Sequence, residues 1–276
     1  MSDIIQAIVL GIVQGITEFM PISSDGHLVI VPWLLGWKDQ SLLFDTVLHW
    51  GTLASVLLVF WRDLWTIFVA TLKSSATRSL IDPNARLGWF IVVGSIPAVL
   101  FGLFLKDFFE ELSTSPLAAG IFLLVTAALL AGSELLAQRR HQTVEIENMR
   151  WGQVILIGFA QVFALLPGLS RSGSTIAAGI ATGVRREAAA RFSFLLGTPA
   201  FLGAALLLLV DALGEDPAKV QAEIPVMLVG AVVSAVVGYL AIRGLLAYLR
   251  RRSLYLFAGY CLVLGMVVIA LYSSGW

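Results

Sequence analysis

Apolar residues in this chain gather into long runs, and six of these runs are long enough to cross a lipid bilayer as helices. A transmembrane helix needs about 20 mostly apolar residues, because the hydrocarbon core is about 30 Å thick and each helical residue advances about 1.5 Å. The six predicted spans cover residues 44–72, 87–105, 116–136, 188–210, 225–245 and 254–272. The pattern therefore predicts an all-α protein that crosses a membrane several times.

Two further apolar runs are broken in the middle by proline and polar residues. The first consists of residues 4–20, a polar stretch at 21–27 and residues 28–35; the second consists of 154–166, 167–175 and 176–183. Each half is short for a crossing, and irregular backbone at membrane depth is tolerated only against protein or a wet cavity. We therefore expect two re-entrant helical hairpins with polar tips. The alternative is that each run forms two tilted spans joined by an ordinary external loop.

Basic and acidic residues occupy different connections, and this predicts the orientation of the chain. Four connections are basic. The first carries Lys73, Arg78 and Arg86; the second, Arg139, Arg140 and Arg150; the third, Arg185, Arg186 and Arg191; and the fourth, Arg250, Arg251 and Arg252. Two are acidic, with Asp107, Glu110 and Glu111, and with Asp211, Glu215, Asp216 and Glu223. Because basic loops stay in the cytoplasm, six spans place the basic connections inside and the acidic ones outside. The first hairpin then enters from outside and the second from inside.

The two halves of the chain also resemble each other. Pro21 precedes one polar tip and Pro167 the other, 146 positions apart, and Gly51 and Gly197, each followed by threonine, are separated by the same interval. Each half then contains one hairpin and three spans, and an odd number of spans inverts the second half. We predict one membrane domain over 1–276, an inverted-topology repeat with halves at about 1–137 and 151–276. Such repeats place a polar site near the midplane, where the halves meet.

Composition agrees with this architecture. Hydrophobic residues make up 58% of the 276 positions and charged residues only 13%, against about 25% charged in soluble domains. The formal net charge is zero, so nothing indicates a nucleic-acid partner.

The first polar tip collects groups that suit acid–base and anion chemistry. Gln14 and Glu18 are four residues apart and share one helix face. Pro21 ends that helix, because the residue before a proline disfavours the α conformation. Ser23 or Ser24 can then cap the next helix, whose first turn carries His27.

The second tip is rich in donors for phosphate oxygens. Arg171 lies between Ser170 and Ser172, and Ser174 and Thr175 follow. The guanidinium is a fixed fork of N–H groups that matches phosphate geometry, and a helix N-terminus attracts anions. This set of residues predicts a site for a phosphate or diphosphate.

Simpler roles exist for several of these residues. Glu18 and Arg171 would form a purely structural ion pair that locks the two hairpins together, since charges at mid-bilayer need partners. A lone histidine such as His27 is commonly a packing residue, and His49 suits the site and the packing equally well. Asp45 is placed to cap the helix that carries His49.

Two segments resemble the signatures of the bacterial undecaprenyl-diphosphate phosphatase family, also called the bacitracin-resistance protein family. The segment QGITEFMPISSDGH at 14–27 resembles (E/Q)xxxE followed by PxSSxGH, and PGLSRSG at 167–173 resembles PGxSRSG. The resemblance extends over nearly the whole chain. It departs at Gln14, where many members have Glu, and at Asp25, where many have Thr.

The resemblance implies hydrolysis of undecaprenyl diphosphate to the monophosphate and inorganic phosphate, which recycles the carrier lipid of cell-wall peptidoglycan synthesis and confers bacitracin resistance. It implies catalytic roles for Glu18, Ser24, His27 and Arg171. It also implies a divalent cation, Mg²⁺ or Ca²⁺, and a bacterial cytoplasmic membrane protein whose site opens to the periplasmic face. We expect the cation at Glu18 with Gln14 and Asp25, and the substrate phosphate at Ser23, Ser170, Arg171, Ser172, Ser174 and Thr175.

Two mechanisms and a second class of protein follow from the same residues. Either Ser24 attacks phosphorus while His27 moves the proton, or water attacks after activation by Glu18 or His27. A transporter or flippase for an anionic lipid would also use broken helices in an inverted repeat. It would not need a serine, a histidine and a glutamate together at one tip. A homodimer is compatible with the sequence, but no motif specifies one.

Overall fold

The computed structural model describes residues 3–37, 41–104, 115–139, 143–163, 165–166, 168–212 and 217–275. Its helices are α1 (Asp3–Thr17), α2 (Ser24–Leu35), α3 (Leu42–Thr77), α4 (Pro83–Phe104), α6 (Pro116–Gln138), the short 3₁₀ helix η1 (Ile146–Asn148), α7 (Trp151–Phe163), α8 (Arg171–Ala181), α9 (Arg186–Ala212), α10 (Pro217–Leu249) and α11 (Tyr255–Ser273). In this part of the chain, extended backbone pairs in one isolated bridge, between Val144 and Val184. The predicted all-α fold is confirmed.

Some residues used in the predictions lie outside the described part of the chain. They are Leu105, Asp107, Glu110, Glu111, Arg140, Pro167, Glu215 and Asp216.

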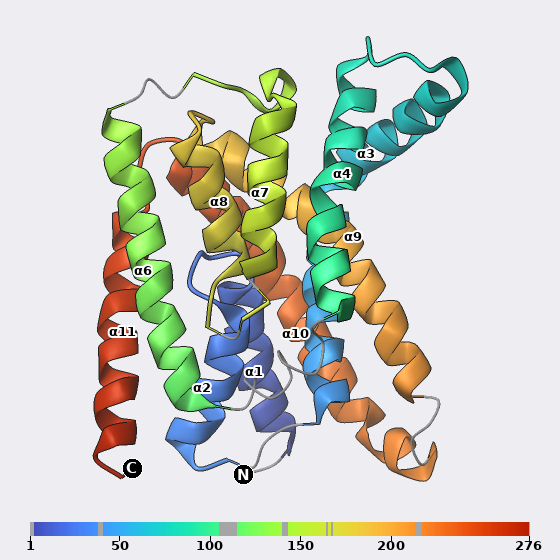
Figure 1. Ribbon diagram of the computed structural model, residues 1–276. Coiled ribbons are helices and arrows are strands. Elements are labelled where there is room, and N and C mark those ends of the chain that lie inside the picture. Colours follow the sequence, from blue (N-terminus) through green and yellow to red (C-terminus); the bar gives the residue numbers. More distant parts are fainter. Residues whose placement is uncertain are drawn as a thin grey trace.

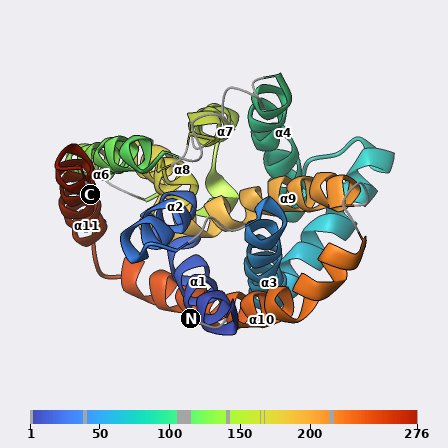
Figure 2. The ribbon, with the colours of Figure 1, turned by 90° about the horizontal axis from the view of Figure 1, so that it is seen from below.

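Five helices in the described ranges are long and apolar enough to cross a membrane: α3, α4, α6, α10 and α11. The sixth predicted span, 188–210, falls on α9, which is 27 residues long but carries Arg186, Glu187 and Arg191 in its first two turns. Its N-terminal half is inside the protein, where Phe192, Phe194, Leu195 and Leu196 are at most 1% exposed. Figure 2 places α9 between α3 and α4, and it contacts both. A helix covered by other helices does not need a lipid-facing surface.

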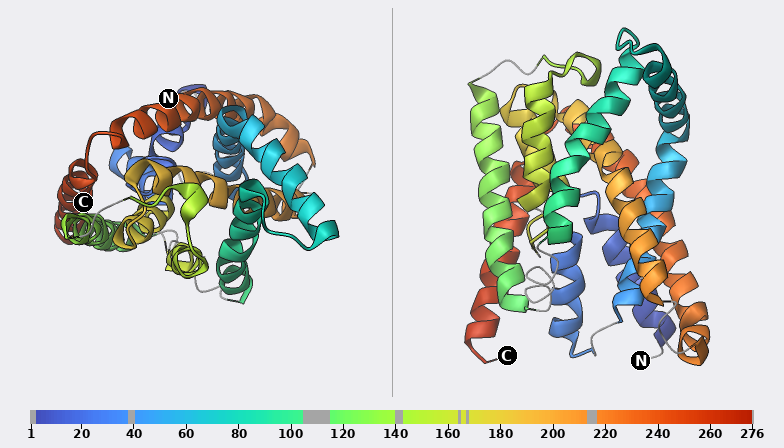
Figure 3. Two further views of the ribbon diagram at one scale, coloured as in Figure 1. Left: turned by 90° about the horizontal axis from the view of Figure 1, so that it is seen from above. Right: turned by 45° about the vertical axis from the view of Figure 1, so that its right-hand side comes forward.

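The two broken runs form the two predicted helical hairpins. The pairs α1–α2 and α7–α8 enter the fold from opposite ends, and their tips meet near its middle (Figure 1). The N- and C-termini lie at the end from which α1 and α2 enter (Figure 3). The polar tips are shorter than predicted, because α2 begins at Ser24 and α8 at Arg171. Most of the polar residues therefore belong to first helical turns.

Each hairpin packs against helices from the other half of the chain. The first hairpin places α1 along α10, and the second places α7 against α4 and α8 against α6. Two backbones approach closely where α7 crosses α4, since a Cβ added at Gly158 would lie 2.5 Å from the carbonyl oxygen of Gly94. Small residues permit such crossings in membrane proteins. The repeat boundaries at about 137 and 151 stay a prediction.

A buried carboxylate joins three helices near the basic connections. Glu134 of α6 is 1% exposed; its Oε1 accepts hydrogen bonds of 2.9 Å from Arg186 Nε and from the Leu254 backbone N–H. Arg186 is the first residue of α9, and Leu254 precedes α11. This cluster was not predicted, because a single acid in an apolar run indicates a buried charge but does not indicate its partner.

We expect Glu134→Ala to lower the free energy of unfolding by about 2–4 kcal/mol, because it leaves Arg186 and a buried N–H group without their acceptor. The midpoint of thermal unfolding in detergent measures this loss. Glu145→Ala is the matched control: its ion pair with Arg185 has both side chains more than 40% exposed, and such pairs contribute about 0–1 kcal/mol. Equal effects of the two substitutions would contradict a structural role for Glu134.

Candidate active site

The first tip is shaped by a helix end followed by a strained cap. The α1 helix ends at Thr17, and the Glu18 N–H still donates to the Gln14 carbonyl oxygen at 3.0 Å, which keeps Glu18 on the face predicted for it. Ser23 then caps α2: its Oγ accepts a hydrogen bond from the Gly26 N–H at 3.3 Å. Its φ of 71° lies in a region that L-residues rarely occupy. This turn directs Ser24 back towards the end of α1.

The second tip is capped in the same way and anchored to α6. Ser170 Oγ accepts from the Gly173 N–H at 3.0 Å, so α8 begins at Arg171. Thr126 of α6 donates to the Gly168 carbonyl at 3.2 Å and accepts from the Ser170 N–H at 3.1 Å. Gly168 has a φ of +89°, and a Cβ there would lie 2.5 Å from a backbone oxygen of α6. Glycine at this position is therefore required by both conformation and space.

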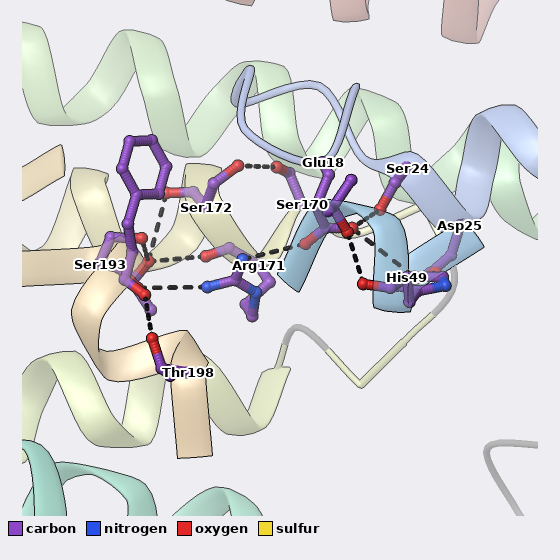
Figure 4. Close-up of polar contacts among 12 residues, drawn as sticks. Glu18, Ser24, Asp25, His49, Ser170, Arg171, Ser172, Ser193 and Thr198 are labelled. Carbon is purple, nitrogen blue, oxygen red and sulfur yellow. Dashed lines mark hydrogen bonds and ion pairs between the residues drawn. The ribbon is translucent and has the colours of Figure 1, made fainter. Parts of the chain in front are cut away.

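The two tips touch through an ion pair and a hydrogen bond (Figure 4). Arg171 Nη2 lies 2.9 Å from Glu18 Oε1, and Ser172 Oγ donates to the Met20 carbonyl oxygen at 3.1 Å. The Glu18 and Arg171 side chains are only 4% and 14% exposed. The structure therefore brings together residues that are 153 positions apart in the sequence.

The second carboxylate oxygen of Glu18 faces the serine of the first tip. Glu18 Oε2 accepts a hydrogen bond of 2.6 Å from Ser24 Oγ and one of 3.0 Å from Gln14 Nε2. A hydrogen bond from hydroxyl to carboxylate at this distance is charge-assisted and strong. Glu18 thus connects a potential nucleophile to a potential phosphate ligand.

Arg171 is held in place by residues of α9 that were not among the predicted site residues. Its Nη1 donates to the Ser193 carbonyl oxygen at 3.2 Å, and its guanidinium lies 4.5 Å from the centre of the Phe201 ring. A Cβ at Gly197 would lie 2.3 Å from Nη1, so only glycine leaves room for the guanidinium. The equal spacing of Gly51 and Gly197 within the two halves was the available signal for this position.

His49 lies in the site, beside both carboxylates of the first tip. Its Nε2 is 3.4 Å from Asp25 Oδ1 and 3.6 Å from Glu18 Oε2, and its Nδ1 is 2.8 Å from the Asp45 carbonyl oxygen. The ring also packs 6.4 Å from that of Phe201, which contacts Arg171. Of the two roles that the sequence left open for His49, the structure selects the one in the site.

His27 points away from Ser24. Its Nδ1 is 2.6 Å from the Ser23 carbonyl oxygen and its Nε2 is 2.7 Å from the Tyr260 hydroxyl. Because a carbonyl oxygen can only accept a hydrogen bond, Nδ1 carries the proton, and Nε2 of the neutral ring accepts from the Tyr260 hydroxyl. The rings stack with centres 5.7 Å apart. In this geometry the proton partner of Ser24 is Glu18, and His27 supports the backbone of the first tip.

The predicted phosphate ligands of the second tip do not all face the site. Thr175 Oγ1 bonds to the Arg171 carbonyl oxygen and to Ser193 Oγ, both at 2.7 Å, and Ser170 is occupied as a helix cap. Ser174 is 5% exposed, and its Oγ has no hydrogen-bond partner among the described residues. It lines an apolar cavity between α6, α7 and α8. Arg171 is therefore the residue of this tip that faces Glu18 and Ser24.

Oxygen atoms suited to a divalent cation are present but few. Glu18 is buried, Asp25 is 55% exposed, and the buried Oε1 of Gln14 has no hydrogen-bond partner within the described ranges. In those ranges no group of three His, Cys, Asp or Glu side chains is arranged to hold a metal ion. Magnesium commonly takes one or two carboxylates and completes its shell with substrate phosphates and water. The residues present fit a cation shared with a bound phosphate.

Fold and site together define a class: multi-pass α-helical membrane proteins in which two opposed helical hairpins bring a serine, a carboxylate and an arginine to one buried polar centre. The comparisons with known proteins make this specific. The family model of the bacitracin resistance protein BacA matches residues 7–267. The chain belongs to this family.

Relatives are similar along nearly the whole of this chain. An undecaprenyl-diphosphatase of Methanosphaera stadtmanae is 43% identical over 288 residues, which cover 98% of this chain and 99% of that protein. Undecaprenyl-diphosphatases of a Nostoc strain and a Mycobacterium strain are 42% and 40% identical. They align with 99% and 98% of this chain, and the alignments cover 85% and 97% of their own lengths.

Proposed function

We propose that this protein is an integral-membrane phosphatase that hydrolyses undecaprenyl diphosphate to undecaprenyl phosphate and inorganic phosphate. The observation that carries the proposal is the double role of Glu18, which accepts a hydrogen bond from Ser24 and forms an ion pair with Arg171. A nucleophile, its base and a phosphate ligand are thereby in contact at one point. Relatives at about 40% identity are undecaprenyl-diphosphatases, and membership in the BacA family agrees with a role in bacitracin resistance.

The geometry supports attack by Ser24. The Ser24 hydroxyl gives its proton to Glu18 as its Oγ forms a bond to the terminal phosphorus, and the bond from that phosphorus to the bridging oxygen breaks. Polyprenyl monophosphate leaves, and water then attacks the phosphoserine, so that inorganic phosphate is released and Ser24 regains its proton. Arg171 binds the terminal phosphate: two of its five N–H groups are used in the described contacts, and the fork suits phosphate oxygens.

Charge balance favours a divalent cation, Mg²⁺ or Ca²⁺, in this reaction. Glu18 and Asp25 would repel an incoming diphosphate, and among the described ion pairs only Arg171 and His49 contact these carboxylates. Glu18 and Asp25, with Gln14 Oε1, are the residues that would hold the cation. When bound, it neutralises charge on the phosphates.

Phosphate release tests the function directly. We expect the purified protein in detergent micelles to release inorganic phosphate from undecaprenyl diphosphate, and a chelator to suppress the release. The competing class is a lipid transporter, because opposed hairpins of this kind also occur in transporters. Lack of phosphate release, together with movement of the lipid across liposome membranes, would establish the transporter instead.

Ser24→Ala separates attack by serine from attack by water. We expect the substitution to lower kcat by about 10³-fold or more, because the nucleophile is lost. The matched control is Ser75→Ala, since Ser75 is exposed and bonds only its own helix backbone in the described contacts. Acid quenching of the wild-type reaction should trap a phosphoserine at Ser24. Sustained phosphate release by Ser24→Ala would mean that water attacks and Ser24 only binds.

We place the protein in the bacterial cytoplasmic membrane, with the site open to the periplasmic face. The orientation follows from the basic connections, which lie at the end of the fold opposite the termini and remain inside by the positive-inside rule; the first hairpin then enters from the periplasmic side. A tag fused after residue 276 should then be accessible from outside the cell.

A further inference from the structure

A large apolar cavity begins beside the second tip. It has a volume of about 810 Å³, within the range of ligand pockets, and lies between α6, α7 and α8. Figure 1 shows α8 between α6 and α7 over the half of the fold that carries the basic connections. Three phenylalanines, Phe122, Phe159 and Phe163, are among the lining residues. Phe159 and Phe163 are 47% and 61% exposed, so the cavity is accessible from the membrane-facing side.

One residue that lines the cavity follows Arg171 closely on α8. Ser174 lines it, three residues after Arg171 on α8, which is about 4.5 Å along the helix. Ala181, at the end of α8, and Arg139, just after α6, line it as well. The cavity therefore leads from the depth of the two tips towards the end of the fold with the basic connections.

One polar atom in this cavity lacks a partner. Ser174 Oγ is buried and makes no hydrogen bond to any described residue, although a buried hydroxyl without a partner costs about 1–3 kcal/mol. It is near the end of the cavity closest to Arg171, and most of the lining further along is apolar. This arrangement suits a ligand with a polar head at the tip and a long apolar chain beyond it.

The depth of the site restricts where such a chain can go. Both hairpin tips lie near the middle of the fold (Figure 1), so a lipid whose phosphate reaches Arg171 has its tail already at mid-membrane. The tail then needs an apolar path away from the tips, and the cavity between α6, α7 and α8 provides one. We propose that this cavity binds the polyprenyl chain of the substrate and makes the enzyme selective for long chains; the proposal rests on the phosphatase function above.

Filling the cavity tests the proposal through substrate choice. A Cβ at Gly132, which lines the cavity, has no heavy atom within 4 Å, so the backbone has room for a side chain there and Gly132→Phe adds a ring at the cavity wall. Ala160→Phe fills it from α7. Gly244→Phe is the matched control, because Gly244 is exposed on α10 and also has free space around its Cβ.

The readout is kcat/KM for undecaprenyl diphosphate and for the much shorter farnesyl diphosphate. We expect Gly132→Phe and Ala160→Phe to lower kcat/KM for the long substrate by about 10-fold or more. They should lower kcat/KM for the short substrate by less than about 2-fold, because only the long chain would fill the cavity. Gly244→Phe should change neither. An equal decrease in kcat/KM for both substrates would overturn the proposal. An unchanged kcat/KM for both would also overturn it and would indicate that an ordinary bilayer lipid occupies the cavity. If the wild type hydrolysed neither substrate, this result would instead refute the phosphatase function.

A labelling experiment on the wild-type protein is independent of how well the variants fold. An undecaprenyl diphosphate analogue with a photoreactive group on its chain should label α6 or α7 residues of the cavity, and excess unlabelled substrate should compete. Labelling confined to other helices would overturn the proposal.

Discussion

Arg171→Ala is expected to lower kcat/KM for undecaprenyl diphosphate by about 10³–10⁵-fold, the range found when an arginine that stabilises a transferring phosphoryl group is lost. Arg171 is the cation of the second tip that contacts Glu18, and Ser193, Gly197 and Phe201 fix its orientation. Its removal takes away the ligand for the phosphate and also leaves Glu18 buried without its ion pair. Phosphate release in micelles measures the effect.

Two further substitutions define the cause. Arg171→Lys keeps the charge but not the fork, so we expect most of the loss to remain. Arg191→Ala is the matched control: Arg191 also forms an ion pair, at 2.7 Å with Asp63, but both side chains are about 40% exposed, and activity should stay within about 2-fold of wild type. Near wild-type turnover by Arg171→Ala would refute the assignment of Arg171 as the phosphate ligand.

Glu18→Gln is expected to lower kcat by about 10²–10⁴-fold, the usual contribution of a general base. The amide is the same size as the carboxylate and can still accept a hydrogen bond from Ser24, but it cannot take the proton from Ser24 or attract a cation. Because Glu18 also pairs with Arg171 at 2.9 Å, some loss of substrate affinity should accompany the loss of kcat. The measurement is a full kinetic analysis at several Mg²⁺ concentrations.

The control for Glu18 is an acid of similar local chemistry outside the site. Glu187 forms ion pairs with Arg185 and Arg250, and Glu187→Gln should leave kcat unchanged. If Glu18→Gln raised KM but kept the wild-type kcat, Glu18 would be a binding residue and Ser24 would need another base. His49, 3.6 Å from Glu18, would then be the nearest candidate.

The hydrophobic pattern alone was sufficient to predict the helices. Runs of about 20 apolar residues have few alternatives to membrane-spanning helices, because every backbone N–H and C=O group must be paired within lipid. Helices α3, α4, α6 and α11 therefore appear within five residues of their predicted bounds, whereas α10 begins at Pro217, eight residues before the predicted start at 225. Proline and polar residues in the middle of two runs likewise predicted the hairpins. For α9, the pattern predicted a span but not that its N-terminal half would be covered by other helices.

The site was predictable in composition but not in detail. The sequence identified Glu18, Ser24 and Arg171, because charged and hydroxyl groups at hairpin tips need polar partners. It also offered His27 as the proton carrier, because His27 lies at the same tip as Glu18 and two serines. In the structure His27 faces Ser23 and Tyr260, and His49 from another helix faces the carboxylates instead.

The sequence by itself determined which segments are helical, where they break and which chemical groups gather at the breaks, because these depend on local hydropathy and backbone conformation. Only the tertiary structure decided which of those groups meet. Glu18 and Arg171 approach to 2.9 Å because two hairpins enter from opposite ends, and Ser174 faces an apolar cavity although it is three residues from Arg171. Which face of a helix packs against which neighbour depends on contacts between distant segments, and those contacts turn the two tips into one site.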